Sequence, residues 1–98
     1  MDQDKIDALR DELERLRRGA FNVKHSEIVS FAESCGRSLS PRGKHPTYES
    51  VLPNRNPLSI PGHKSLKGFT VKAILKVLEA DLNSWEEMAE ERGKQNDT

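Results

Sequence analysis

The sequence predicts an α+β fold in which helices cover one face of a small antiparallel sheet. Two observations support this fold class. Apolar residues recur at helical spacing near both ends of the chain, and five prolines interrupt the segment between them. Proline restricts that middle segment to short strands and turns. With 98 residues, of which 34% are hydrophobic, the chain can form one small core.

The first predicted helix covers residues 4–18, and we assign residues 1–20 to this N-terminal amphipathic element. Asp4 can cap its start, and Gly19 follows its end. A narrow apolar stripe of this kind must pack on the rest of the domain or pair with a second copy of the chain. The stripe consists of Ile6, Leu9, Leu13 and Leu16.

A shorter helix is predicted over residues 26–34, with Ser26 as its cap and Gly36 just past its end. Three short strands follow, at residues 37–40, 47–51 and 58–60, with a turn at residues 54–57.

The last predicted helix begins at Thr70 as its cap and continues as far as Met88 or Ala89. We assign residues 21–92 to the main domain and residues 93–98 to a disordered tail, because the chain beyond residue 89 is strongly polar. The apolar positions of this helix are Val71, Ile74, Leu75, Leu78, Leu82 and Trp85.

Charge is distributed unevenly along a chain whose formal net charge is zero. Residues 36–76 carry eight basic side chains and one acidic side chain, a net charge of +7 (8 minus 1). A segment of this kind indicates a polyanionic partner such as nucleic acid. The charged residues are Arg37, Arg42, Lys44, Arg55, Lys64, Lys67, Lys72 and Lys76, with Glu49 as the acid.

The first candidate site is the turn that contains Arg42, Gly43, Lys44 and His45. The two cations can bind phosphate, and an imidazole can exchange a proton with a ribose 2′-hydroxyl or a leaving 5′-oxygen. This arrangement would cleave RNA without a metal. The alternative is a solvated basic turn without chemistry.

The second candidate site extends from residue 60 into the start of the last helix. His63, Lys64, Lys67 and Lys72 lie in or next to this segment, and a helix N-terminus attracts anions. We therefore expect RNA phosphate to bind here. In the alternative interpretation, glycines shape a connection and the lysines provide solubility.

Other classes of function find less support. No apolar run reaches the roughly 20 residues of a membrane span, and the N-terminus does not have the pattern of a signal peptide, so we expect a cytoplasmic protein. Cys35 is the single cysteine, and His25, His45 and His63 lack metal-ligand spacing. We expect no metal and no other cofactor.

Residues 23–82 resemble the HicA family of toxin ribonucleases. The resemblance rests on a helix of the Ser-Glu-Ile-Val-x-Phe-Ala-Glu type at residues 26–33, with a glycine closing it. It also rests on Gly43-Lys44-His45 in place of a Gly-Ser-His turn, and on Pro61-Gly62-His63 at a strand end. The segments 66–70 and 74–76 resemble the family's Leu-x-x-Gly-Thr and Ile-Leu-Lys motifs, the first with one inserted residue.

The resemblance implies a fold like that of double-stranded-RNA-binding domains, here with an extra N-terminal helix. It implies a metal-independent messenger-RNA endonuclease, with His45 as the catalytic residue and a HicB-like antitoxin as the inhibitor. The chain departs from the family pattern at Lys44, where serine is usual, and at Pro46, which follows the histidine directly.

Two other functions stay open. The chain can be a non-catalytic RNA-binding module on the same fold, or an adaptor that uses the Ile6–Leu16 stripe and the Trp85 end of the last helix. For the N-terminal helix we expect self-association into a homodimer or docking of the antitoxin.

Overall fold

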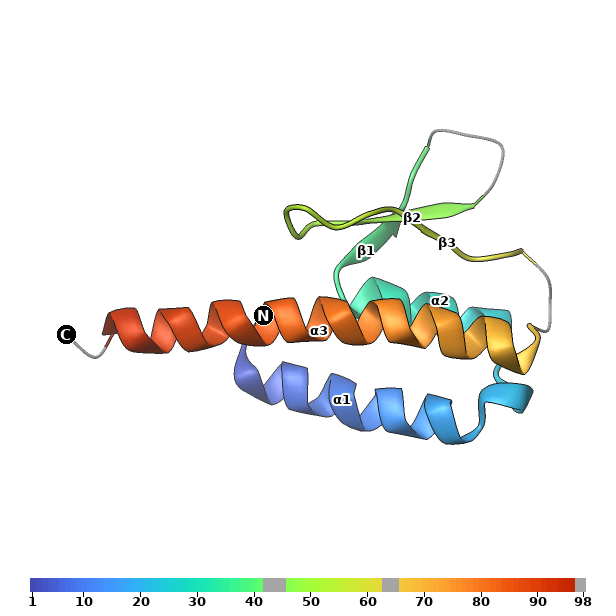
Figure 1. Cartoon of the computed structure of the whole chain (residues 1–98), viewed down its shortest axis with the longest axis horizontal. Coiled ribbons are helices and arrows are strands. Elements are labelled where there is room, and N and C mark those ends of the chain that lie inside the picture. Colours follow the sequence, from blue (N-terminus) through green and yellow to red (C-terminus); the bar gives the residue numbers. More distant parts are fainter. Residues whose placement is uncertain (42–45, 63–65, 97–98) are drawn as a thin grey trace.

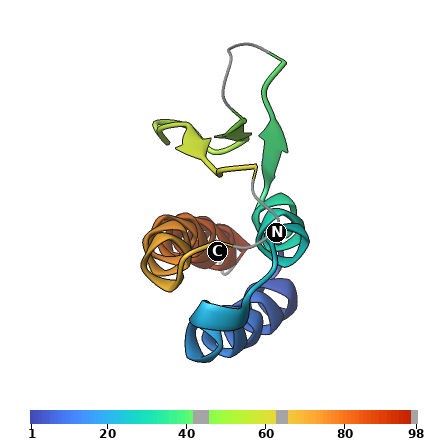
Figure 2. The ribbon, with the colours of Figure 1, turned by 90° about the vertical axis from the view of Figure 1, so that its right-hand side faces the viewer.

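The computed structural model describes residues 1–41, 46–62 and 66–96, with side chains of these residues up to Arg92. The elements form three layers (Figures 1 and 2): a sheet, a middle layer of helices α2 and α3, and helix α1 on the side away from the sheet. The described part is α+β, with a small three-stranded antiparallel sheet whose helices all lie on one side. The predicted fold class is confirmed at this level.

Helix α1 spans Gln3–Arg18, close to the predicted bounds. Its cap is Asp2, whose carboxylate accepts a hydrogen bond from the Lys5 N–H at 2.8 Å. The prediction that Asp4 caps the helix is therefore wrong, and Asp4 lies in the first turn, where a negative charge favours the helix dipole. Gly19 ends the helix as predicted, with its N–H donating to the Arg15 carbonyl at 3.2 Å.

Helix α2 spans His25–Ser34 and follows a short 3₁₀ helix, η1, at Ala20–Asn22 that the sequence did not predict. Its cap is Lys24 instead of the predicted Ser26. The Glu27 carboxylate accepts a hydrogen bond from the Lys24 N–H at 3.3 Å, which satisfies a backbone donor at the helix start. Glu27, the third residue of the helix, thus satisfies the N–H of the cap residue itself, and its own N–H donates to the Lys24 carbonyl at 3.0 Å.

The three strands are confirmed within one residue at each end. Strand β1 spans Arg37–Leu39, β2 spans Thr47–Ser50 and β3 spans Leu58–Ser59. Both pairings are antiparallel, with β2 in the centre. Tyr48 pairs with Leu39 and Leu58, and Tyr48 and Leu58 are buried whereas Leu39, on the edge strand, is exposed.

Helix α3 spans Gly68–Asn96 and is longer at both ends than the sequence predicts. The Lys67 carbonyl accepts from the Val71 N–H at 3.0 Å, so Thr70 lies inside the first turn and is not the cap. At the other end the helix continues past Ala89 and through residues 93–96 of the predicted disordered tail. This part extends beyond the other two layers (Figure 1).

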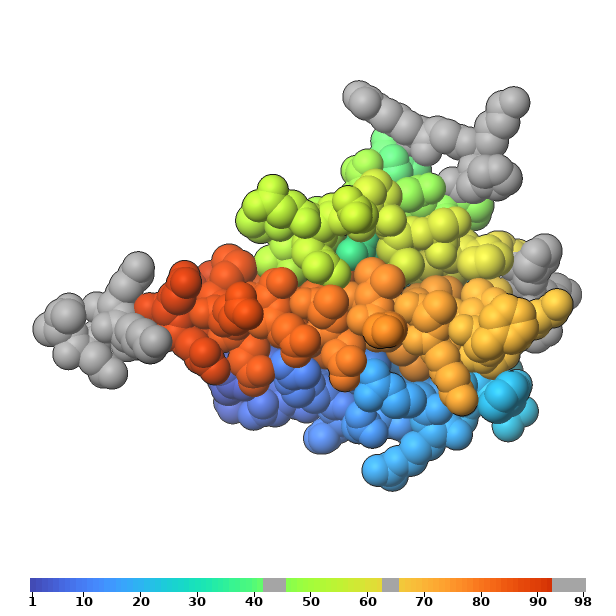
Figure 3. Space-filling view, viewed as in Figure 1, coloured from blue at the N-terminus to red at the C-terminus, as the bar shows by residue number. Residues whose placement is uncertain are grey.

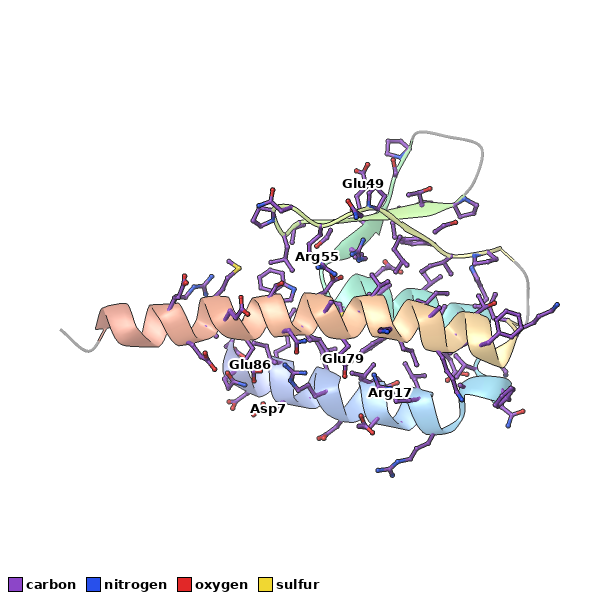
Figure 4. The ribbon with its side chains drawn as sticks, in the orientation of Figure 1. Asp7, Arg17, Glu49, Arg55, Glu79 and Glu86 are labelled. Carbon is purple, nitrogen blue, oxygen red and sulfur yellow. The ribbon has the colours of Figure 1, made fainter. Side chains whose placement is uncertain are left out.

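The core lies between the three layers. All four residues of the α1 stripe are buried against it, so packing on the domain is the arrangement within this chain. Exposed or half-exposed pairs border this packing: Arg10 binds Glu86 at 2.7 Å, and Arg17 binds Glu79 at 3.1 Å (Figure 4).

The end of α2 meets α3 through a close backbone contact. The Trp85 indole Nε1–H donates to the Cys35 carbonyl at 2.8 Å. Gly36 has a φ of 97°, and a Cβ atom there would lie 3.1 Å from the Trp85 ring. Glycine is thus required both by the backbone conformation and by the space available.

Candidate nucleic-acid interface

Most of the predicted site residues lie outside the part of the chain that the structure describes. These are Arg42, Gly43, Lys44, His45, His63 and Lys64. The remaining two, Lys67 and Lys72, are exposed at the start of α3. The structure therefore describes the residues next to both candidate sites, and within the second site it describes Lys67 and Lys72.

The described ends of the two candidate segments meet beside the sheet. The Ile60 N–H donates to the Pro46 carbonyl at 3.2 Å, and a Cβ atom on Gly62 would lie 4.0 Å from Pro46 Cγ. In the sequence, Pro46 directly follows His45, and Gly62 directly precedes His63. Two segments that are distant along the chain are thus joined next to their histidines.

Two exposed phenylalanines lie at the same end of the molecule as the lysines of α3. Phe21, on η1, is 74% exposed, and Phe69, in the first turn of α3, is 68% exposed. The Lys72 ammonium lies 5.3 Å from the centre of the Phe21 ring, and the Lys67 ammonium lies 5.8 Å from that of Phe69. We name these four residues the Phe–Lys patch.

The contact between η1 and α3 holds this patch together. A Cβ atom at Gly68 would lie 2.3 to 2.8 Å from three atoms of the Phe21 ring, so the ring rests directly on the glycine backbone. Figure 3 shows the two elements adjoining at one end of the molecular surface. Phe21 therefore lies against the residue that precedes Phe69, although the two phenylalanines are 48 positions apart (69 minus 21) in the sequence.

The two phenylalanines were not among the predicted site residues. Their sequence signal is weak, since Phe31 is equally apolar and is buried with only 3% exposed. The available hints are the glycine beside Phe69 and the absence of acidic residues from positions 19–24 and 66–76.

The positive segment is less available to a ligand than its formal charge indicates. Arg37 and Asp81 are fully buried and joined by two hydrogen bonds, of 2.7 Å to Oδ2 and 3.1 Å to Oδ1. Arg55 donates to the same carboxylate at 2.8 Å and is about a quarter exposed (Figure 4). Two of the eight cations are therefore committed to an acid that lies outside the segment.

Arg37 holds the sheet to α3 by more than this ion pair. Its guanidinium also donates to the carbonyls of Tyr48 and Asn56, at 2.9 and 3.0 Å. A buried charge of this kind is stable only when its donors are satisfied. Arg37 therefore positions the strands and does not reach a ligand.

A cavity of about 400 Å³ between α1 and α2 does not suit a polyanion. Its rim carries one cation, Arg15, which is hydrogen-bonded to both Glu12 and Glu27. The guanidinium of Arg15 lowers the pKa of the Glu12 carboxyl, so this acid stays ionised near neutral pH. The rim is therefore net negative.

The remaining reactive groups of the described chain do not form a catalytic centre. Burial raises the pKa of the Cys35 thiol to about 12, with the Asp81 carboxylate as a further cause, so it is protonated at neutral pH. His25 is half-buried, and its Nε2 atom has no hydrogen-bond partner among the described residues.

The described residues contain no group of three or more His, Cys, Asp or Glu side chains that could hold a metal ion. In the described chain, no helix has the length and apolar character needed to cross a membrane.

Comparison with known proteins found no matching family model, no matching curated protein and no matching solved structure.

Proposed function

We propose that this protein is a HicA-like toxin, an endoribonuclease that cleaves messenger RNA without a metal. His45 acts as general acid or base on the ribose 2′-hydroxyl or the leaving 5′-oxygen. Arg42, Lys44 and Lys64 hold the phosphate and stabilise the charge that develops during transfer.

The contact of Pro46 with the segment Ile60–Gly62 is the observation that supports this proposal most directly. It joins the two basic segments that carry His45 and His63, and a ribonuclease site needs cations beside its proton-transfer group. The element order of helix, three antiparallel strands and helix also agrees with the double-stranded-RNA-binding fold that the resemblance implies.

The proposal includes a HicB-like antitoxin as partner and a cytoplasmic location. The proposed role of α1 in antitoxin docking or homodimer formation must use its outer surface, because its apolar stripe is buried in the protomer. That outer surface is charged, with Asp7, Asp11 and Glu14 exposed. It also exposes Lys5, Arg15 and Arg18, so this surface carries both signs of charge and does not select its partner by net charge.

The experiment compares wild-type protein with His45→Ala on a messenger RNA in the presence of EDTA. We expect the wild type to cleave and to arrest growth on expression, and the variant to do neither. Equal thermal unfolding by circular dichroism will show that both are folded. Equal cleavage by the two proteins removes His45 from the mechanism.

A non-catalytic RNA-binding module is the second candidate, and the Phe–Lys patch favours it because that surface needs no histidine to bind. Intact RNA in EDTA, together with binding that weakens steeply as salt rises, would identify the module. Lys5→Gln serves as the control for lost charge and should bind RNA like the wild type, since this lysine is exposed on α1, in the layer away from the sheet.

A further inference from the structure

We propose that the Phe–Lys patch binds unpaired RNA, with bases stacking on Phe21 and Phe69 and phosphates contacting Lys67 and Lys72. This inference rests on the proposed function in taking RNA as the ligand. It assigns a binding surface to residues that are separate from the catalytic turn.

Phe21 and Phe69 are far more exposed than the aromatic side chains of the core. The chain has five aromatic side chains, and those that serve the core are covered: Phe31 is 3% exposed and Tyr48 is 6% exposed. Phe21 and Phe69 instead leave 74% and 68% of their surface in water. Neither residue gains much from burial, so folding does not explain the presence of two large rings here.

The Phe21 ring is held against the start of α3. Gly68 and Lys72 are one helical turn apart and lie on the same face of α3. The glycine backbone and the lysine ammonium therefore both approach the ring from the helix side. Because Phe21 is 74% exposed, most of the ring surface stays available to a ligand, and the contact with Gly68 fixes the ring's position. A flat aromatic face of this kind is a stacking platform for a base.

The segments that carry the two rings are positively charged. Residues 19–24 and 66–76, which form this end of the molecule, contain four lysines and no acid, a net charge of +4 (4 minus 0). An exposed aromatic pair surrounded by lysines matches a ligand that is both aromatic and anionic. An apolar protein partner would gain nothing from those charges and would have to desolvate them.

The geometry favours unpaired RNA over a duplex. Bases in a duplex are already stacked on one another, and only unstacked bases can offer a face to a protein ring. Stacking is also tolerant of sequence, because every base has a π face. We therefore expect binding with little sequence preference.

The test measures fluorescence anisotropy of a labelled single-stranded 2′-O-methyl RNA of roughly 12 nucleotides, within the range of single-strand sites. This probe lacks the 2′-hydroxyl that cleavage requires, so binding is read with the wild-type protein whether or not it is a nuclease. Phe21→Ala and Phe69→Ala should each weaken affinity by about 5-fold or more. Val51→Ala is the matched control, since Val51 is 71% exposed and lies near Trp85, which is 16 positions (85 minus 69) along α3 from Phe69.

Gly68→Ala tests the seating of the ring without removing it. The added methyl group would overlap Phe21, so the ring must turn away, and affinity should fall as it does in Phe21→Ala. A double Lys67→Gln, Lys72→Gln variant should reduce the slope of log affinity against log salt by about 1.4, from about 0.7 per phosphate contact. A duplex of the same sequence should compete poorly.

Affinity unchanged in both phenylalanine variants, or a duplex that competes as well as the single strand, would overturn the inference. Neither result concerns cleavage, which is measured separately with unmodified RNA and His45→Ala. Loss of binding in Val51→Ala would also count against the patch, because it would place the ligand elsewhere.

Discussion

Asp81 is a single carboxylate that serves two arginines. It is fully buried, and it pairs with Arg37 from β1 and with the partly exposed Arg55 from the connection between β2 and β3. Its side chain thereby attaches two parts of the sheet to α3. The cost of removing such a partner comes mainly from the charges left behind.

We predict that Asp81→Asn lowers the free energy of unfolding by about 3–5 kcal/mol, because it leaves the buried Arg37 without a counter-charge. Glu79→Gln, two residues away on the same helix, is the matched control. Glu79 pairs with Arg17, and both side chains are more than a third exposed. Loss of this pair should therefore lower the free energy of unfolding by less than about 1 kcal/mol. Urea unfolding followed by circular dichroism measures both, and equal losses would contradict the buried-pair interpretation.

Cys35 gives the fold a dependence on alkaline pH. Burial raises the pKa of its thiol from 9.0 to about 12, so the folded protein retains a proton that the unfolded chain releases. The stabilisation is complete below about pH 9 and is lost as the pH rises toward 12.

We predict that the stability difference between wild type and Cys35→Ala shrinks over this pH range, by up to about 1.4 kcal/mol per pH unit. Urea titrations at a series of pH values will measure it. Because the other titrating groups are common to both proteins, their contributions cancel in the difference. A difference that is constant with pH would show that the thiol is not held protonated.

At the scale of elements, α1 is a structural part of the domain. Its apolar stripe packs on the layer of α2 and α3, opposite the sheet (Figures 1 and 2). Removing it would expose the apolar face of that layer to water.

We predict that Leu13→Ala, at a position only 2% exposed, costs about 2–5 kcal/mol. Arg10→Gln, which removes a pair at the border of the same packing, should cost less than about 1 kcal/mol. Deletion of residues 1–18 should abolish cooperative thermal unfolding, as measured by calorimetry. A cooperative transition in the truncated chain would instead show that the domain folds without α1.

The elements were predictable where periodicity and proline determine them. The first and last helices follow from apolar spacing, and the three strands follow from the prolines between these helices. Helix starts were less predictable: Asp4, Ser26 and Thr70 all have capping side chains, yet Asp2, Lys24 and Lys67 precede the helices. A cap depends on which side chain reaches the free N–H groups, and several nearby residues qualify.

The candidate site was less predictable than the fold. Sequence identified Lys67 and Lys72, because basic residues at a helix start are a local signal. It missed Phe21 and Phe69, because the sequence alone does not distinguish an exposed phenylalanine from a buried one such as Phe31. It also counted Arg37 as available, because its partner Asp81 is 44 positions away (81 minus 37).

At the scale of the whole molecule, charge is separated along α3. The molecule measures 50 × 32 × 16 Å, and α3 lies along its longest dimension (Figure 1). Lys67 directly precedes the helix and Lys72 lies in its second turn, whereas its far end carries the exposed acids Glu87, Glu90 and Glu91. At 1.5 Å per residue, Lys72 is about 25 Å from these acids.

This separation makes the effect of the acidic end depend on salt. The screening length is about 8 Å at 0.15 M ionic strength and about 30 Å at 0.01 M. RNA bound at the Phe–Lys patch should therefore experience repulsion from the acids only when salt is low.

We predict that a variant with Glu87, Glu90 and Glu91 replaced by glutamine binds the 2′-O-methyl probe within about 2-fold of wild type at 0.15 M salt. At 0.01 M the same variant should bind several-fold more tightly, because three unscreened negative charges have been removed. Fluorescence anisotropy over a salt series measures both limits. Tighter binding that is equal at the two salt concentrations would mean that RNA contacts the acidic end directly, and would contradict its placement at the start of α3.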